Sequence, residues 1–258
     1  MERFYLSLAS SSQRYAAKTL GYPYILVNYM TRMNKPPQYG YEELFIDSGG
    51  FSSSLLSGEY TKSDDEYLWH VEELQPDYFA LRDYPCEPEL LKQHGRTVEM
   101  HQEMTLEHHL QLLDKLDNYD ITGDWVPVLQ GWTLEEYLDC VDLFREHGLL
   151  CDYVAIGSVC RRGSQNEIRR IISVVKHQIG GRRLHAFGLN VGVLRDPHLW
   201  SCVYSVDSGA FDYAARKRRW VGDLQGLSMN DAALVCLEDT LVRVHYLRGY
   251  HEGQGVLV

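Results

Sequence analysis

Eight short apolar runs recur along this chain of 258 residues, and they constrain its fold more than any other feature. The runs do not alternate apolar with polar residues, which is typical of parallel strands that are buried on both faces. We interpret them as strands at residues 5–8, 24–27, 44–46, 78–81, 126–129, 153–156, 184–187 and 203–206.

Helical segments separate many of these runs. Thr133 and Ser164 each stand three residues before a glutamate and ahead of apolar residues with helical spacing, which is the pattern of a capping box. Gly148 and the pair at 180–181 are expected to end these two helices. Residues 88–116 are predicted as one long helix, and residues 228–247 as a C-terminal helix.

The alternation of strands and helices predicts an α/β fold, a single (β/α)8 TIM-type barrel with a C-terminal helix. A length of about 250 residues is typical of such a barrel. We expect one domain over residues 1–258, because no linker or low-complexity tract divides the chain. A doubly wound open sheet is the alternative, but no Gly-X-Gly-X-X-Gly follows the first strand.

The motif Asp-Ser-Gly-X-Phe occurs twice, starting at Asp47 and at Asp207, and each copy closes a predicted strand. Small residues after an acid let a ligand approach the backbone closely. Barrel enzymes place their catalytic groups at the carboxyl ends of the strands. The two acids are remote in sequence and meet only if the strands close into a barrel. Asp47 and Asp207 are therefore candidate catalytic carboxylates.

Other predicted strands also end in polar or small residues, namely Asp83, Gln130, Gly157 with Ser158, and Gly188. A single acid at a strand end often only caps the following helix. Several such residues at one mouth of a barrel instead predict a polar binding site.

In this order, these residues resemble the tRNA-guanine transglycosylase superfamily. The motifs that carry the resemblance lie between Leu44 and Arg219: Asp-Ser-Gly-Gly-Phe at 47–51, Asp-Tyr-Pro at 83–85, Leu-Gln-Gly at 129–131, Gly-Ser at 157–158 and Ser-Val-Asp-Ser at 205–208. The short length, the form of the last motif and the missing zinc segment are most similar to the DNA-directed branch, the deazapurine DNA-modification transglycosylases. The resemblance implies a pentosyltransferase that replaces guanine in DNA with a 7-deazaguanine such as 7-cyano-7-deazaguanine.

The resemblance also implies roles for the strand-end residues. Asp207 would attack C1′ and hold the sugar covalently, and Asp47 would serve as general acid and base. Asp83 and Gln130 would read the Watson–Crick edge of the base, and a backbone N–H near Gly157 would donate to O6. The base is expected between the aromatic rings of Phe51 and Phe187. The small residues Ser48 and Gly188 are expected on the same substrate-binding wall.

The residues themselves leave alternatives open. Asp212 lies five residues beyond Asp207 and is an alternative nucleophile. Gln130 is also consistent with a side chain that satisfies a neighbouring backbone group. The two phenylalanines, Phe51 and Phe187, are consistent with ordinary core residues. His185 lies in the middle of a predicted strand and is expected to be a hydrogen-bonded interior residue.

The charge is distributed unevenly. The net charge is −11, yet residues 161–219 hold 12 Lys and Arg against four acids, and the remainder holds 13 against 32. A basic region on an otherwise acidic chain is typical of a surface presented to a polyanion. Two clusters are expected to contact phosphates on the catalytic face, although basic runs on exposed loops also occur without a partner: Arg161 with Arg162, and Arg216, Lys217, Arg218 with Arg219.

The cysteines and the lengths of the apolar stretches indicate the cellular compartment that we expect for the protein. The six cysteines are scattered without a Cys-X-X-Cys pair, so we expect reduced thiols in a cytoplasmic protein, without structural zinc or another cofactor. No apolar stretch approaches the roughly 20 residues that span a bilayer, so we expect no membrane partner. The expected partners are DNA, a free 7-deazaguanine base and companion DNA-modification proteins.

Three other functions fit the same residues. The first is the same base exchange on tRNA. The second is a nucleoside or glycoside hydrolase, in which water takes the second step. The third is a non-catalytic barrel that binds nucleic acid.

Overall fold

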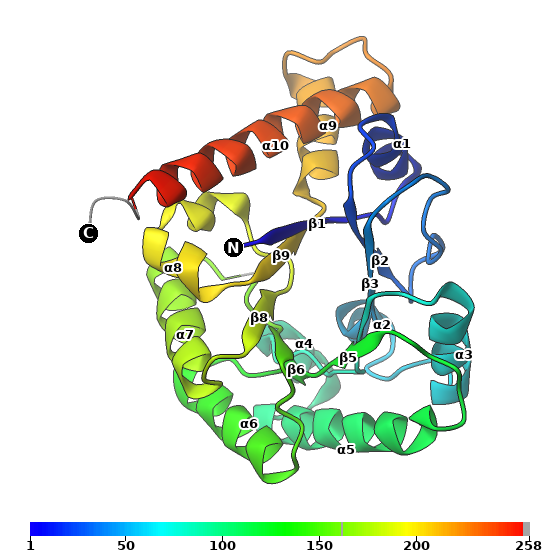
Figure 1. Cartoon of the computed structure of the whole chain (residues 1–258), viewed down its shortest axis with the longest axis vertical. Coiled ribbons are helices and arrows are strands. Elements are labelled where there is room, and N and C mark those ends of the chain that lie inside the picture. The colour runs from blue at the N-terminus through cyan, green and yellow to red at the C-terminus, as the bar shows by residue number, and fades with distance from the viewer. Residues whose placement is uncertain (161, 255–258) are drawn as a thin grey trace.

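The computed structural model describes residues 1–160 and 162–254, which form a barrel of parallel strands surrounded by helices (Figure 1). The strands follow the order β5-β4-β3-β2-β1-β9-β8-β7-β6. The first and last strands therefore lie side by side, as a barrel requires. The strands are β1 (Arg3–Ser7), β2 (Tyr24–Asn28), β3 (Glu43–Asp47), β4 (Tyr78–Ala80), β5 (Asp124–Val126), β6 (Val128–Leu129), β7 (Tyr153–Ile156), β8 (Arg183–Ala186) and β9 (Ser205–Ser208).

The predicted barrel is confirmed, with its fifth strand divided in two at Pro127. Proline has no N–H for the ladder, and β5 pairs with β4 while β6 pairs with β7. The Pro127 carbonyl still accepts from the Ala155 N–H at 2.8 Å, and the carbonyl of Val126 accepts from the Leu81 N–H at 2.9 Å. One residue therefore joins the two ends of the sheet, and the barrel is nearly closed.

Helices surround the sheet: α1 (Ser11–Thr19), α2 (Gly50–Leu56), α3 (Asp64–Leu74), α4 (Pro88–His94), α5 (Val98–Leu116), α6 (Leu134–Glu146), α7 (Gln165–Gln178), the 3-10 helix η1 (Val191–Arg195), α8 (Pro197–Cys202), α9 (Ala210–Val221) and α10 (Met229–Gln254). The last of these, α10, runs along the outside of the barrel in Figure 1. None of the described helices is both long and apolar enough to span a membrane.

The predicted helix starts are confirmed, but two predicted extents are wrong. The Thr133 and Ser164 side chains accept from the backbone N–H three residues on, at the starts of α6 and α7. The single helix predicted over 88–116 is two helices, because Gly95 takes a left-handed φ of 64° and Thr97 caps a new helix. The C-terminal helix continues beyond the predicted residue 247 to Gln254.

The apolar residues form two layers. The larger layer fills the space between the sheet and the helices and includes Phe4, Ile46 and Val206. The smaller layer fills the barrel interior and includes Tyr5, Phe45 and other inward-facing residues of the strands. Because side chains alternate along a strand, these two layers determine which strand-end residues face the barrel.

Candidate active site

The inward face of the barrel ends in polar side chains at one edge. Tyr5, Leu26 and Phe45 belong to the interior layer, and each is followed two residues later by another inward-facing position. These positions are the last residues of β1, β2 and β3, namely Ser7, Asn28 and Asp47. The same alternation carries Asp207 of β9 inward, because the residue before it, Val206, packs in the outer layer.

A cavity of about 220 Å³ lies at this edge. Its lining includes eight residues that the sequence placed at the predicted mouth: Asp47, Phe51, Asp83, Gly157, Ser158, Phe187, Gly188 and Asp207. The acids at 47 and 207, which are 160 positions apart in sequence, therefore line the same cavity. The wall also includes residues that were not predicted, among them Asn28, Glu87 and Cys160.

Asp207 is held at the end of β9 by donors from two neighbouring strands. Its Oδ1 accepts from the Gly188 N–H at 2.6 Å, and its Oδ2 accepts from the Ser7 hydroxyl. Nε2 of His185 lies 3.4 Å from Oδ1. Gly188 takes a left-handed φ of 63°, which turns its N–H toward the carboxylate. These contacts fix the orientation of the carboxylate at the cavity.

Behind Asp207, a chain of buried hydrogen bonds crosses the barrel interior. His185 Nδ1 lies 2.6 Å from the Ser205 hydroxyl, which lies 2.5 Å from the hydroxyl of Tyr153. His185 is fully buried, so its interpretation as a hydrogen-bonded interior residue is confirmed. The ring of Phe187, on the cavity wall, packs edge-on against His185 with 4.5 Å between the ring centroids.

Asp47 occupies the matching position on β3. Its Oδ2 accepts from the Asn28 amide at 2.6 Å, and its Oδ1 accepts from the Gly49 N–H at 3.0 Å. Burial raises the pKa of Asp47 to about 6, and the charge of Asp207 acts in the same direction. The two hydrogen bonds oppose this shift. A carboxyl with a pKa of about 6 is suited to give and take a proton near neutral pH.

The glycines of the first motif are required by close approach. Gly49 has φ of 84°, and a Cβ there would lie 2.6 Å from Met30 Cγ. A Cβ on Gly50 would lie 2.4 Å from the backbone oxygen of Asp83. The chain can therefore turn into α2 directly against the cavity wall only without these side chains. Phe51 follows in the first turn of α2 and lines the cavity.

Asp83 is buried in the loop after β4 and is held by two side chains. Its Oδ2 accepts from the Gln130 amide at 2.5 Å, and its Oδ1 accepts from the Ser48 hydroxyl at 3.2 Å. Burial raises the pKa of Asp83 to about 7, and the charge of Asp47 adds to this effect. The hydrogen bond from Gln130 opposes it. Asp83 thus changes charge close to neutral pH.

A comparison of the sequence with known protein families covers all of these site residues. The model of the family DeoxyPurine in DNA protein A (DpdA) matches residues 2–241 of the chain. The chain belongs to this family. The family comprises DNA deazapurine-modification transglycosylases, so the resemblance drawn from the motifs is confirmed at the family level. A search of the curated proteins finds no match to the chain.

Two residues predicted to bind the base, Gln130 and Ser48, lie behind Asp83 and are not part of the described cavity lining. The amide oxygen of Gln130 accepts from Ser158 at 2.8 Å while its nitrogen donates to Asp83. Ser48 is fully buried between Asp83 and the hydroxyl of Tyr60. In this DpdA-family chain both residues therefore orient Asp83.

Gly157 lines the cavity, but its N–H is already used. This N–H donates to the Leu129 carbonyl at 3.0 Å, in the pairing of β6 with β7. The Gly157 N–H is therefore not available to a base, and the expected hydrogen bond to O6 is wrong for this residue. A Cβ at this position would lie 2.2 Å from the Gln130 amide nitrogen. The glycine is needed because the side chain of Gln130 packs against it.

Asp212, the alternative nucleophile, does not belong to the described cavity lining. Its Oδ1 accepts from the Ser12 hydroxyl at 2.6 Å, and its Oδ2 pairs with Arg216 at 2.7 Å. Asp212 therefore ties α9 to the first turn of α1. The geometry favours Asp207, whose carboxylate reaches the cavity.

The structure corrects the expected phosphate contact of Arg162. The Arg162 side chain is fully buried, pairs with Glu167 at 2.5 Å and donates to the carbonyls of Ser158 and Trp132 at 3.0 and 2.6 Å. Its guanidinium is therefore used within the protein, where it braces the loop after β7. Arg161, its predicted companion, lies outside the described residues.

The second basic cluster, 216–219, lies in the last turns of α9. At a rise of about 1.5 Å per residue, it begins roughly 9 Å beyond the start of that helix. Arg218 pairs with Asp223 and Asp239 at 2.7 and 2.6 Å, and Arg219 donates to the Leu227 carbonyl at 2.8 Å. Lys217 is exposed. None of the four residues belongs to the described cavity lining, and their expected contact with phosphates stays a prediction.

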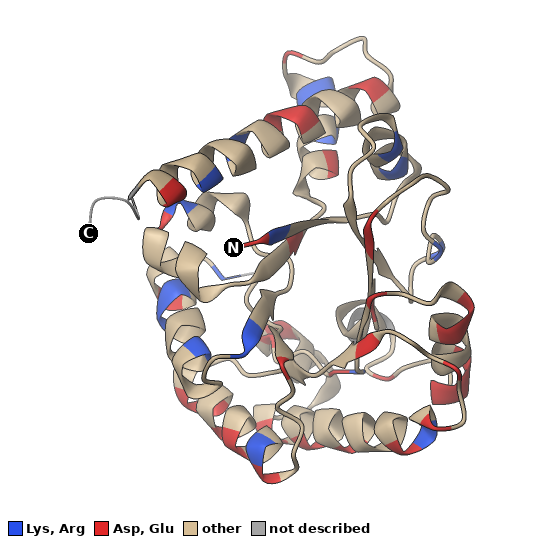
Figure 2. Ribbon diagram, in the orientation of Figure 1, with Lys and Arg blue, Asp and Glu red and all other residues tan. Residues whose placement is uncertain are grey.

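Charges nevertheless separate across the molecule. In Figure 2, Lys and Arg recur along α7 and α9, whereas α3 carries Asp and Glu, and α10 carries both kinds of charge. The uneven distribution seen in the sequence therefore corresponds to different sides of the barrel.

Among the cavity and support residues that were missed from the sequence are Ser7, Asn28 and Glu87. Ser7 and Asn28 close the first two strands, so the rule that selected Asp47 would have selected them as well. Glu87 had no such signal. Its Oε2 accepts from the Ser158 hydroxyl at 2.9 Å, which depends on a loop meeting the end of a distant strand. Among residues 1–160 and 162–254, no group of three His, Cys, Asp or Glu is placed to hold a metal ion.

Proposed function

We propose that this protein replaces guanine in DNA with a 7-deazaguanine, such as 7-cyano-7-deazaguanine, through a covalent glycosyl-aspartate. The observation that carries the proposal is that Asp47 and Asp207, from β3 and β9, line one cavity in a member of the DpdA family. A double displacement needs two carboxyl groups with different tasks on one substrate. The different surroundings of these two acids support such a division.

In the first half-reaction, an Asp207 oxygen attacks C1′ of the target nucleotide. The bond between C1′ and N9 breaks, and the electron pair leaves with guanine. Asp47 donates a proton to the departing base, which suits a carboxyl whose pKa is about 6. The sugar is then held as an ester of Asp207 while the DNA backbone stays intact.

In the second half-reaction, the 7-deazaguanine occupies the place of guanine. Asp47 takes the proton from N9, and N9 attacks C1′. The ester bond to Asp207 breaks, which regenerates the carboxylate. Two inversions at C1′ restore the original anomer, so the product is again a β-nucleotide.

Asp83 is the group that we assign to recognition of the base. As a carboxylate it accepts from N1–H and the 2-amino group, which guanine and 7-deazaguanine share. The hydrogen bonds from Gln130 and Ser48 hold its oxygens in place. Phe51 and Phe187 line the same cavity and are assigned to the faces of the ring. A base in a duplex would have to be flipped out to reach them.

The exchange can be tested with guanine-labelled DNA. The protein is incubated with labelled DNA or labelled tRNA, with and without 7-cyano-7-deazaguanine, and the release of guanine is followed. We expect release from DNA that requires the added base. Release without any base would indicate a hydrolase, and release from tRNA alone would indicate the other branch of the superfamily. No release in any arm would contradict the proposal for the isolated protein, and companion proteins would then be added to the same assay.

The covalent step has its own test. Denaturation during turnover is expected to trap a DNA adduct on wild-type protein, and Asp207→Asn is expected to abolish it. Asp212→Asn is the matched control, because it makes the same change in a carboxyl group five residues further along the chain and outside the described cavity lining. An adduct that persists in Asp207→Asn and disappears in Asp212→Asn would transfer the role of nucleophile to Asp212.

A further inference from the structure

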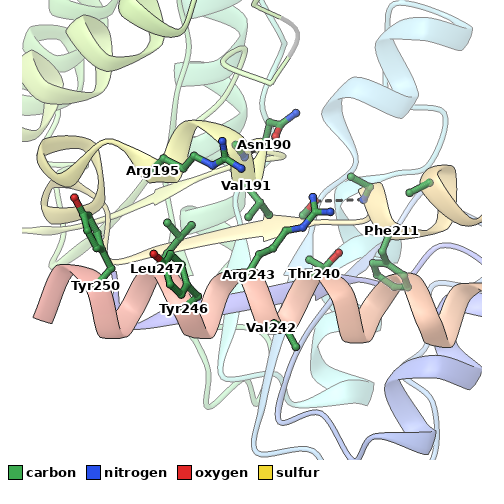
Figure 3. A pocket seen from close by; sticks show the side chains of 14 residues that line it. Asn190, Val191, Arg195, Phe211, Thr240, Val242, Arg243, Tyr246, Leu247 and Tyr250 are labelled. Atoms are coloured by element: carbon green, nitrogen blue, oxygen red, sulfur yellow. Dashed lines mark hydrogen bonds between the residues drawn. The ribbon is translucent and has the colours of Figure 1, made fainter. Parts of the chain in front are cut away.

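A second pocket, of about 730 Å³, lies outside the barrel between α10, η1 and the start of α9 (Figure 3). It is larger than the catalytic cavity, and the mechanism above does not use it. In Figure 3, Arg195 extends from the η1 side, and Arg243, Tyr246 and Tyr250 come from α10. Its size is in the range of pockets that hold small ligands or single nucleotides.

The pocket adjoins the catalytic edge through two chain segments. Ser208, which lines the pocket, directly follows Asp207 in β9. Asn190, on the opposite wall, lies two residues beyond Gly188, whose N–H holds Asp207. Because consecutive Cα atoms are about 3.8 Å apart, both walls are within a few ångströms of the catalytic cavity. In the proposed mechanism, a strand whose sugar is held at Asp207 would therefore have this pocket beside it.

The charge of the pocket is unlike that of the protein as a whole. The chain carries a net charge of −11, yet the described lining contains two arginines and no acid. Arg195 and Arg243 are both exposed, and neither forms an ion pair within the described part of the chain, whereas Arg169, Arg216 and Arg218 do. Unpaired guanidinium groups in a pocket favour a ligand with phosphate oxygens.

The remaining wall is apolar and aromatic. Tyr246 is 69% exposed and stacks on Tyr250 at an interplanar angle of 15°. Val191 and Leu247 contribute apolar surface beside them. An exposed aromatic face next to two cations is the arrangement that binds an unpaired base together with its phosphate.

We propose that this pocket binds a nucleotide next to the target guanine in the same DNA strand. Arg195 and Arg243 pair with its phosphates, and its base packs against Tyr246. The proposal rests on the proposed function for the identity of the polymer, and it adds where the strand leaves the active site. Arg243 and Tyr246 lie beyond residue 241, where the match to the family ends, so the pocket is not fully contained in that match.

The first test measures binding of a guanine-containing single-stranded oligonucleotide by fluorescence anisotropy over a range of salt concentrations. Loss of one phosphate contact makes the slope of log K against log salt shallower by about 0.7 for single strands. The double variant Arg195→Ala with Arg243→Ala is therefore expected to lower the slope by about 1.4. Lys18→Ala, which removes an exposed cation of α1 outside the pocket lining, is expected to leave the slope unchanged.

The aromatic contact is tested separately. Tyr246→Ala is expected to weaken binding on the order of tenfold, whereas Tyr246→Phe keeps the ring and is expected to bind like wild type. Urea unfolding midpoints of all variants verify that they are folded. Oligonucleotides with 5-iodouracil on either side of the guanine are also expected to crosslink to the α10 peptide.

The outcomes separate the two proposals. If wild-type protein exchanges guanine in DNA but the arginine double variant keeps its affinity and salt slope, the pocket proposal is wrong and the function stands. The same conclusion follows if crosslinks form only elsewhere, or if Lys217→Ala lowers the slope while the pocket variants do not. If binding depends on the pocket but no exchange occurs, the pocket stands and the exchange reaction fails.

Discussion

Replacing Asp83 with asparagine should make the protein more stable than wild type above about pH 7, although the change removes a residue assigned to base recognition. Burial raises the pKa of this carboxyl from its ordinary value near 3.8 to about 7. The folded chain therefore holds the proton more tightly than the unfolded chain. The resulting stabilisation is fully present below about pH 4 and is lost as the pH rises through 7.

The structure allows asparagine to fit in place of the acid. The asparagine oxygen can accept from Gln130, as Oδ2 of Asp83 does at 2.5 Å. Its nitrogen can donate to the hydroxyl of Ser48, which lies 3.2 Å from Oδ1. Between pH 5 and 7 only the wild-type protein loses stability through this group, by about 1.4 kcal/mol per pH unit. The free energy of unfolding of the variant, relative to that of wild type, should therefore rise by about 2–3 kcal/mol from pH 5 to 8.

Urea denaturation at pH 5, 6, 7 and 8 measures this difference directly. Asp114→Asn is the control, because Asp114 is exposed on α5 and its replacement should give a difference that does not change over this range. A difference for Asp83→Asn that stays constant, or that shrinks as the pH rises, would refute the reasoning. It would mean that the buried carboxyl is already ionised at pH 5.

Other parts of the site give further predictions. The pH profile of kcat/KM for adduct formation should be bell-shaped with its maximum between about pH 6 and 7, because Asp47 must be protonated and Asp83 ionised; a flat profile from pH 5 to 8 would contradict these roles. Gly50→Ala should cost about 1–3 kcal/mol in urea denaturation, because its Cβ would meet a backbone oxygen at 2.4 Å, whereas Gly40→Ala, with no atom within 4 Å, should be nearly neutral. Asp212→Ala should destabilise the fold by about 1–3 kcal/mol and still form the adduct, since it breaks the bonds between α9 and α1; loss of the adduct in a folded variant would contradict that structural role.

The fold and the positions of the acids were predictable because they depend on local patterns. Uninterrupted apolar runs identify buried parallel strands, and a barrel brings their carboxyl ends to one edge. Asp47 and Asp207 follow from this rule and reach one cavity. The division of the fifth strand also has a local cause in Pro127, although the continued pairing of its carbonyl with Ala155 depends on the closed barrel.

The supporting contacts were not predictable in the same way. Arg162 belongs to a basic run, yet a loop carbonyl, a tryptophan carbonyl and Glu167 take up its guanidinium. The cluster at 216–219 follows the last strand in sequence, but a helix carries it away from the strand end. Gln130 follows β6 and was a candidate for base binding, but its amide donates to Asp83 in the loop after β4. The partners of Gln130 and the Trp132 carbonyl beside Arg162 are distant in sequence, and the nearer partners are reached only through the folded loop or helix.

The three acids of the mouth are nevertheless connected by a simple geometric relation. Each carboxyl is bound by a residue at the end of a neighbouring strand or loop: Asn28 is the direct register partner of Asp47, Ser7 and Gly188 flank Asp207, and Ser48 and Gln130 flank Asp83. Strand-end residues therefore have to be interpreted as neighbours around the barrel, because adjacent ends determine which oxygens are held and which can reach a ligand. The proposed base exchange requires this restraint, since in that mechanism the sugar stays fixed at Asp207 while one base leaves and another enters. A carboxylate held by donors on two sides keeps its position through both half-reactions, which a single acid on a free loop would not.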